Sequence, residues 1–281
     1  MEVASLKNNL ILIVDSCTDF EKETQDIQRV PFRLLIDGEE IIDECLDINK
    51  LINKMKNTKQ QIKTACAPPN DFIKKLKKEA NNFIVTISSQ LSGSYNSAKV
   101  AAETFMKKFP GSFVHVFDTK TASSGESLIA VKVKQLIEKN ISPAEIIEQT
   151  NKYISNLRTL FILDSLDNLA KNGRISNIKA VLANFVHIVP IMGEDGQGKI
   201  VLKESVRGKK RAFSRLIDII GEYNIDFENT ILGITHVNCL EKAEELRDKI
   251  KKRYPFKDVK IFQSSGLSTI YADDGGIVIA F

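Results

Sequence analysis

Short apolar runs that end in polar residues recur through the first half of the chain. Residues 10–14, 83–87 and 113–117 are such runs, and a pair of polar residues closes each of them. Continuous apolar runs of this length are typical of strands buried in a parallel sheet. Residues 71–80 and 96–109, which lie between the runs, carry apolar side chains at helical spacing. This alternation predicts a parallel sheet with helices on both faces.

The polar pairs mark the carboxyl ends of the predicted strands. They are Asp15-Ser16, Ser88-Ser89 and Asp118-Thr119. Ligands of open parallel sheets bind at these strand ends. We therefore expect a polar functional site along this edge of the sheet.

A second series of elements begins after residue 157. Ser142, Pro143 and Glu145 have the arrangement of a helix N-cap and first turn, so we predict a helix from there to about residue 156. The pattern then predicts a strand from residue 160, a helical stretch over 166–185, a hairpin, helices over 209–223 and 240–253, and strands over 230–235, 259–262 and 276–280. The predicted fold class is α/β with two domains, residues 1–157 and 158–281.

Composition narrows the class of protein. The 281 residues suffice for two domains, and 40 basic against 36 acidic residues give a net charge of only +4, which does not favour a nucleic-acid partner. The four cysteines are widely spaced and predict no metal site. No apolar stretch approaches the roughly 20 residues that span a bilayer, and the first residues lack a signal-peptide pattern. We expect a cytoplasmic protein without an integral membrane segment.

The segment Ser88-Ser-Gln-Leu-Ser92-Gly93-Ser-Tyr-Asn-Ser-Ala98 follows a predicted strand and opens a predicted helix. Backbone N–H groups at a helix start are unsatisfied and suit a carboxylate or a phosphate. Ser92 adds a hydroxyl donor, and Gly93 permits close approach of a ligand to the backbone. On spacing alone, an ordinary serine N-cap explains the segment equally well.

This segment resembles the S-S-x-L-S-G-T-Y-x-S-A signature of the DegV family. Other family motifs follow in the family's order: Ile13-Val-Asp-Ser16, Leu166-x-x-Leu-x-x-x-Gly173-Arg174-Ile175-Ser176, and the segment from Pro190 to Arg207-Gly208-Lys209-Lys210. The resemblance covers essentially the whole chain. It implies a soluble bacterial carrier that holds one long-chain fatty acid in a hydrophobic tunnel. The carrier presents the carboxylate to a separate fatty acid kinase, which makes the acyl phosphate used in phospholipid synthesis.

The resemblance also implies what the chain lacks and which residues bind. A carrier of this kind is not an enzyme, needs no cofactor, and is expected to be a monomer when free. The carboxylate-binding hydroxyls fall on Thr64 and Ser92, next to Gly93. Thr64 is followed by Ala-Cys-Ala, where the family usually has Ser-Gln-Pro, and a simple turn hydroxyl is the alternative. Arg174 is expected to contact the kinase or the phosphoryl group.

Two further positions complete the expected site. Arg207 is expected to face the ligand's polar end, because guanidinium matches carboxylate and phosphate oxygens, or else to be a solvated surface arginine. Tyr271 stands where the family has the histidine of His-x-Gly-Pro-Gly. A phenol donates a hydrogen bond but is neutral near pH 7, and Asp273 and Asp274 would repel an anion if they pointed inward. Headgroup affinity or ligand identity is therefore expected to differ from the family's pattern.

Two other functions stay open. One is a small-molecule hydrolase or phosphotransferase that uses Asp15, Ser92 and Asp118, and the other is a lipid-responsive regulatory protein. The pattern Gly193-x-x-x-x-Gly198-Lys199 fails as a phosphate loop because Ile200 stands where Ser or Thr must bind magnesium. We predict a hairpin turn there instead.

Overall fold

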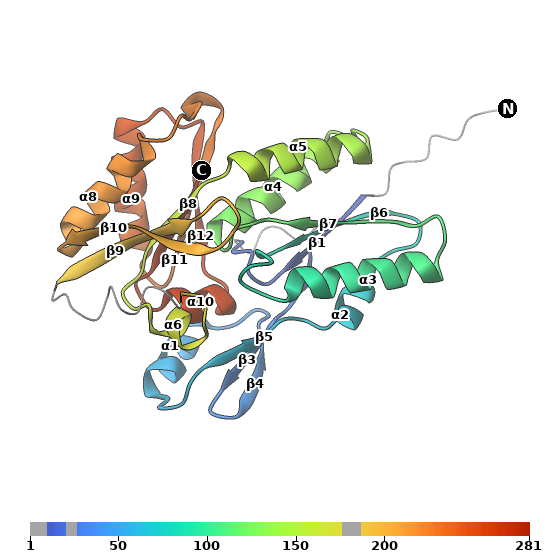
Figure 1. The fold of residues 1–281 in the computed structure, drawn as a ribbon, viewed down its shortest axis with the longest axis horizontal. Coiled ribbons are helices and arrows are strands. Elements are labelled where there is room, and N and C mark those ends of the chain that lie inside the picture. Colours follow the sequence, from blue (N-terminus) through green and yellow to red (C-terminus); the bar gives the residue numbers. More distant parts are fainter. Residues whose placement is uncertain (1–9, 21–26, 176–186) are drawn as a thin grey trace.

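The computed structural model describes residues 10–20, 27–175 and 187–281 (Figure 1). A four-stranded sheet in the order β2-β1-β6-β7 forms the centre of the first half, and all its pairs are parallel. Its strands are β1 (Leu10–Asp15), β2 (Gln28–Val30), β6 (Asn81–Thr86) and β7 (Phe113–Asp118). The parallel sheet expected from the apolar runs is therefore present.

Helices cover both faces of this sheet, as expected. α2 (Pro69–Ile73) and α3 (Ser94–Lys108) pack against one face, and α4 (Ser124–Glu138) and α5 (Pro143–Asn156) pack against the other. The alternation of the strands explains the two cores, because Leu12 and Val14 face α4 whereas Ile13 faces α3. The N-cap of α5 is the predicted capping box between Ser142 and Glu145.

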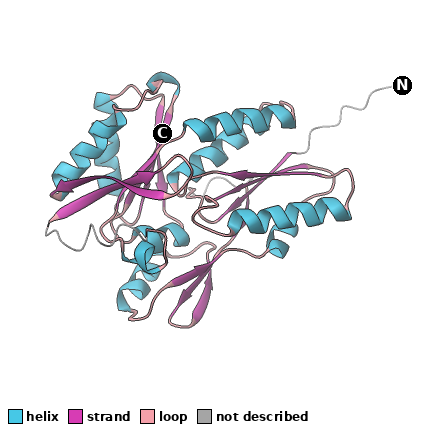
Figure 2. Ribbon diagram, in the orientation of Figure 1, coloured by secondary structure: helices cyan, strands magenta, loops and turns pink. Residues whose placement is uncertain are grey.

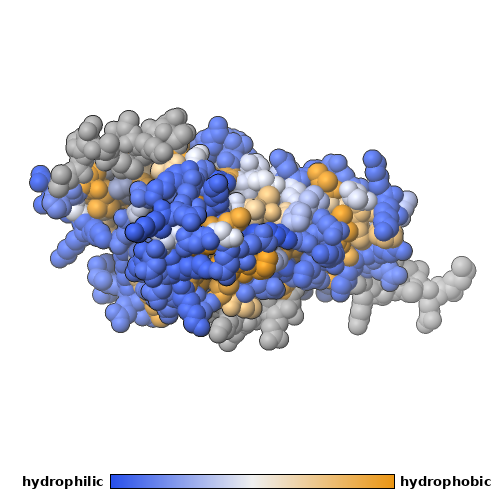
Figure 3. All heavy atoms as spheres, turned by 90° about the horizontal axis from the view of Figure 1, so that it is seen from below, coloured by the Kyte–Doolittle hydropathy of each residue, from blue (hydrophilic) through white to orange (hydrophobic). Residues whose placement is uncertain are grey.

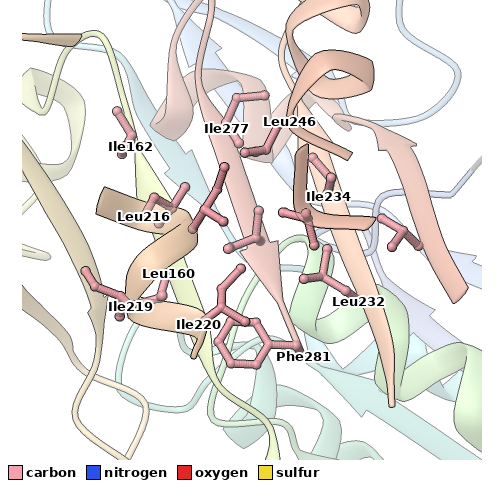
Figure 4. Close-up of a cluster of buried hydrophobic side chains, with 14 of the residues drawn as sticks. Leu160, Ile162, Leu216, Ile219, Ile220, Leu232, Ile234, Leu246, Ile277 and Phe281 are labelled. Atoms are coloured by element: carbon pink, nitrogen blue, oxygen red, sulfur yellow. The ribbon is translucent and has the colours of Figure 1, made fainter. Parts of the chain in front are cut away.

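A six-stranded mixed sheet forms the second half, in the order β10-β9-β8-β13-β11-β12. Its strands are β8 (Thr159–Ile162), β9 (Ile188–Glu194), β10 (Ile200–Arg207), β11 (Ile231–His236), β12 (Asp258–Gln263) and β13 (Ile277–Ala280). β11 and β12 are parallel, and the other pairs are antiparallel. α8 (Lys209–Ile220) and α9 (Leu240–Arg253) cover one face, where Leu216 and Leu246 meet side chains of the strands (Figure 4).

A small antiparallel sheet, which the sequence did not predict, lies below the two large ones (Figure 2). It consists of β3 (Arg33–Ile36), β4 (Glu39–Ile42) and β5 (Lys63–Ala65), in the order β4-β3-β5. α1 (Ile48–Asn57) follows β4, and α10 (Gly266–Ala272) from the far end of the chain packs against α1. Two short helices, α6 (Asp167–Lys171) and the 3₁₀ helix η1 (Phe227–Asn229), complete the described elements.

The large sheets lie on either side of residue 157, but the two halves share hydrophobic cores. Phe262 and Ala280 of the second half pack with the α4 side of the first sheet, and Leu267 of α10 packs with Leu34 of β3. The division into domains 1–157 and 158–281 therefore stays a prediction. The surface seen in Figure 3 is mostly hydrophilic, with hydrophobic residues gathered near its middle. No described helix is both long and apolar enough to cross a membrane.

One predicted helix is shorter than expected, and a second predicted helical stretch is described only in part. The helix predicted over 71–80 ends at Ile73, because the Asn82 side chain binds the backbone of Lys77 and Ala80 and holds the intervening residues in turns. In the stretch predicted over 166–185, α6 is the only helix up to residue 175. Residues 176–185 lie outside the described residues. Helix α9 has the predicted bounds, and the predicted hairpin joins β9 to β10.

Candidate functional site

A cavity with mainly apolar walls lies between the two halves of the protein. Its volume, traced by the centre of a water-sized sphere, is about 110 Å³, whereas one water needs roughly 10–15 Å³ on that measure. The second half contributes side chains such as Phe161, Leu163 and Val278, and the first half contributes Ile87 and Leu91. The cavity is therefore lined by residues that are far apart in sequence and suits an apolar ligand.

Polar groups gather where β5 and α10 meet beside this cavity. The hydroxyl oxygens of Thr64 and Tyr271 lie 2.8 Å apart, and Tyr271 lines the cavity. One of their two hydroxyl protons forms this mutual bond, so the other can be donated to a ligand. Arg174 also lines the cavity, and its guanidinium carbon lies 5.7 Å from the centre of the Tyr271 ring. The pair and the arginine can together receive an anion.

The turn at Ser92 and Gly93 lies at the same place. A Cβ atom added to Gly93 would lie 3.3 Å from the sulfur of Cys66, two residues after Thr64. Arg174 Nε donates to the carbonyl oxygen of Leu91, at 3.1 Å. The structure thus brings Thr64, the Ser92–Gly93 turn, Arg174 and Tyr271 together, although Thr64, Ser92 and Gly93 are not among the residues that line the cavity.

The strand-end aspartates bind the backbone of these turns. Asp15 is fully buried and accepts hydrogen bonds from the N–H groups of Cys17 and Ile87 and from the hydroxyl of Ser94, at 3.0, 3.0 and 2.6 Å. Asp118 accepts from the N–H and the hydroxyl of Ser89. Burial raises the pKa of Asp15, and these hydrogen bonds oppose the rise. The expected polar edge exists, but its carboxylates are engaged in holding loops.

Arg207 lies apart from this group. It is the exposed last residue of β10, whereas Ile200 at the other end of β10 lines the cavity. Asp273 and Asp274, which follow Tyr271 closely in the sequence, have partners outside the cavity. Asp274 forms a 2.6 Å ion pair with Lys56, which lowers the pKa of this aspartate, and Asp273 accepts from the N–H of Asp274. Neither aspartate is among the residues that line the cavity.

Sequence reasoning missed how α10 is held. Both oxygens of Asp43 accept backbone N–H groups at the start of α10, from Gly266 and Leu267, each at 2.8 Å. Asp19 accepts from the N–H of Ser265 at 2.7 Å. Burial raises the pKa of Asp43 to about 6. In the sequence, the Ser265-Gly266 pair after an apolar run was the available signal for a helix start. The aspartates that bind this helix start, Asp43 and Asp19, lie over 220 residues earlier and could not be assigned to it.

Two more contacts join the halves around the cavity. The hydroxyl of Ser88 donates to the carbonyl oxygen of Gly198 at the tip of the β9–β10 hairpin, at 2.9 Å. The hydroxyls of Thr121 and Thr159 lie 2.7 Å apart, and both residues line the cavity. Gly198 has φ +91°, and a Cβ atom there would overlap the Ser88 hydroxyl. The hairpin tip therefore needs glycine to dock on the first half.

Known proteins resemble this chain along nearly its whole length. The sequence profile described as an uncharacterised protein of the DegV family matches residues 9–281. A DegV domain-containing protein of Streptococcus gordonii is 31% identical, over 96% of this chain and 98% of its own length.

Solved structures agree in fold. A DegV-family protein from Ruminococcus gnavus, refined with vaccenic acid, has a TM-score of 0.93 at 35% identity and covers 97% of this chain and 99% of its own. The Fatty Acid Kinase (Fak) B3 protein of Streptococcus pneumoniae, loaded with linoleic acid, has a TM-score of 0.91 at 27% identity, with the same two coverages. A third, from Eubacterium eligens, is loaded with heptadecanoic acid and has a TM-score of 0.89 at 29% identity, covering 96% and 98%.

Proposed function

The chain belongs to the DegV family, and from that premise we propose that it binds one long-chain fatty acid and presents the carboxylate to a separate fatty acid kinase. The observation that carries the proposal is the apolar cavity with hydroxyl and guanidinium groups at one place on its wall. The Ruminococcus, Streptococcus and Eubacterium structures, which contain fatty acids, support the same ligand class.

The acyl chain supplies most of the affinity in this proposal. Burial of each methylene contributes about 0.8 kcal/mol, so a 16-carbon chain contributes roughly 12 kcal/mol before the costs of ordering and association. The walls contain Phe161, Leu163, Leu169 and Val278, which replace water around the chain. This contribution is the reason to expect that a lipid remains bound during purification.

The polar groups fix the direction of the ligand. The Tyr271 hydroxyl, in contact with Thr64, donates to the carboxylate, and the Ser92–Gly93 turn lies beside it. Two of the donor nitrogens of Arg174 bind the carbonyl oxygens of Leu91 and Asn172, which holds the guanidinium at the site. A neutral phenol replaces the family's histidine, so the positive charge near the carboxylate comes from Arg174. Arg174 is then the residue that the kinase or the phosphoryl group meets.

The engaged aspartates favour a carrier over a hydrolase. Asp15 and Asp118 already accept hydrogen bonds from the turns that follow their strands. We propose that the carrier works in the cytoplasm as a monomer, without a cofactor and without a nucleic-acid partner. Arg207, exposed at the end of β10, is outside the proposed carboxylate site.

Native mass spectrometry of the protein purified from bacterial cells tests the ligand. We expect one added mass equal to that of a fatty acid. In a reconstituted reaction with fatty acid kinase and ATP, replacement of Thr64 and Ser92 by alanine should slow acyl-phosphate formation. Thr104→Ala is the control, because this hydroxyl lies on exposed α3 and binds its own helix. A lipid-free protein that turns over a soluble substrate would instead establish an enzyme.

A further inference from the structure

Three carboxyl groups share one buried compartment behind the polar side of the cavity. Asp15 ends β1, Asp19 follows it, and Glu126 lies in the first turn of α4; none of the three is more than 1% exposed. Cys17, which lines the cavity, lies in the same compartment. Within the described ranges, no set of three or more His, Cys, Asp or Glu could hold a metal ion. The charge of this cluster must be limited in another way.

Hydrogen-bond donors are distributed unevenly among the three carboxyls. Asp15 and Asp19 each accept three hydrogen bonds. The donors to Asp15 are Cys17 N, Ile87 N and Ser94 Oγ, and the donors to Asp19 are Ser265 N, Ser123 Oγ and Ser268 Oγ. Both oxygens of Glu126 are buried without a hydrogen-bond partner among the described residues. The two aspartates are thus prepared to carry negative charge, and Glu126 is not.

The electrostatic surroundings of the three carboxyls favour protonation of Glu126 over protonation of the aspartates. An ionised carboxylate without donors in a dry interior is unstable, and neighbouring anions make it more so. Burial, followed by repulsion from Asp15 and Asp19, raises the pKa of Glu126 well above its usual range. Asp15 is the neighbouring group that acts on it most strongly. Of the three carboxyls, Glu126 is therefore the one whose surroundings most favour the protonated form.

We propose that Glu126 is a positioning residue that stays a neutral carboxylic acid, leaves the negative charge of this compartment to the two aspartates, and thereby keeps Asp15 and the ligand-binding turn in place. The inference rests on the proposed function, since the turn at Ser92 and Gly93 is part of the proposed carboxylate site. Ser94 connects Asp15 to this turn. Its hydroxyl donates to Asp15 at 2.6 Å, and its N–H donates to the Ser92 hydroxyl at 3.2 Å. If Glu126 were ionised, its negative charge would repel and displace Asp15, and the turn would lose this support.

The direction of the pH effect follows from the raised pKa. A carboxyl group whose pKa is higher in the folded protein than in the unfolded chain stabilises the fold at low pH, and this contribution is lost as pH rises through the folded value. Ionisation of Glu126 at alkaline pH should therefore loosen the turn and weaken fatty-acid binding. The groups that face it in the compartment are Asp15, Asp19 and the Cys17 thiol.

The test measures the dissociation constant of palmitate from about pH 6 to about pH 10. The wild type should weaken by about tenfold or more at the alkaline end, which corresponds to about 1.4 kcal/mol. Glu126→Ala should bind weakly throughout. Glu126→Gln, which resembles the neutral acid and cannot ionise, should restore binding and change by less than about twofold over the same range. Glu138→Gln, on the exposed end of the same helix, should retain the alkaline loss.

Two readouts that need no ligand separate this inference from the proposed function. Infrared difference spectra at neutral pH should show a protonated carboxylic acid that Glu126→Gln removes. The protection of the amides of residues 92–94 against hydrogen exchange, relative to the intrinsic base-catalysed rate at each pH, should fall at alkaline pH in the wild type but not in Glu126→Gln. If palmitate does not bind at any pH, the proposed function fails while these readouts still decide the role of Glu126. An ionised Glu126 at neutral pH, or an alkaline loss unchanged in Glu126→Gln, would overturn the inference.

Discussion

The hydroxyl pair formed by Thr64 and Tyr271 allows a quantitative test of the proposed carboxylate site. The oxygens lie 2.8 Å apart, and Tyr271 lines the cavity whereas Thr64 does not. We therefore expect Thr64 to donate to the tyrosine oxygen, and Tyr271 to donate its own proton to the carboxylate. The perturbations are Thr64→Val, Tyr271→Phe and the double variant, each of which removes hydroxyl groups with little change of shape.

The expected magnitudes follow from the type of each hydrogen bond. Tyr271→Phe removes a bond to a charged acceptor, worth about 1.5–3 kcal/mol, so palmitate should bind roughly 10- to 150-fold more weakly. Thr64→Val removes a neutral bond of about 0.5–1.5 kcal/mol, so binding should weaken roughly two- to tenfold. In the Tyr271→Phe background the threonine has lost the partner through which it acts, and Thr64→Val should have almost no further effect.

Calorimetric titration of the delipidated proteins with palmitate measures the dissociation constant for the wild type, the two single variants and the double variant. Thr104→Val is the matched control, because it removes an exposed hydroxyl that binds the backbone of its own helix. If Thr64→Val weakened binding as much in the Tyr271→Phe background as in the wild type, Thr64 would contact the ligand independently. If Tyr271→Phe bound palmitate normally, the carboxylate would not lie at this hydroxyl pair at all.

Three other outcomes test the cavity and its supports. Because burial raises the pKa of Asp43 from 3.8 to about 6, the folded protein binds a proton that the unfolded chain releases, and its free energy of unfolding should fall by about 2 kcal/mol between about pH 4 and 6 on this account. Denaturant titrations should find that Asp43→Asn removes this part of the pH dependence; an unchanged slope would contradict the assignment. Ala122→Phe fills the cavity and should abolish the lipid mass in native spectra, whereas Ala144→Phe on the exposed surface of α5 should retain it. Gly198→Ala and Gly196→Ala both place alanine at a positive φ, but of the two only Gly198 lacks space for a Cβ atom. The free energy of unfolding of Gly198→Ala, measured by thermal unfolding, should therefore fall by about 1–3 kcal/mol more than that of Gly196→Ala. Equal losses would exclude docking of the hairpin tip.

The parts of the fold predicted from sequence are those with a local physical signal. Strands β1, β6 and β7 are buried on both faces and therefore appear as continuous apolar runs. The capping box of α5 consists of two side chains three residues apart, and α9 has one buried stripe on an otherwise charged helix. Each of these signals is complete within a few residues, so no knowledge of the tertiary structure is needed.

The missed elements lack such a signal. β4 is almost fully exposed, and β5 has only three residues, so neither shows an alternating pattern. The first turn of α4 is buried although it contains Ser124, Glu126 and Ser127, which conceals its inner face. Asn82 shortens α2 through bonds to a loop that periodicity does not show.

The candidate site was only partly accessible from sequence. The Ser92–Gly93 turn could be predicted as a candidate ligand site because strand, small residues and helix start are contiguous. Thr64 and Tyr271 are 207 residues apart, and only the family resemblance connected them before the structure placed their hydroxyls in contact. The proposed proton on Glu126 depends on its burial beside Asp15 and Asp19, which lie more than 100 residues earlier in the sequence, so it could not be inferred before the fold was known.

Helix α10 explains why neither half of the chain can form the proposed site alone. It carries Tyr271 and Leu267 on the cavity wall, yet the N–H groups at its start are bound by Asp43 and Asp19 from the first half. The helix therefore has its cavity-lining position only when the halves are packed together. A ligand that binds this arrangement and not the unfolded chain stabilises the contact between the halves by mass action. The affinity for a fatty acid and the stability of the interface between the halves are thus linked through this one helix.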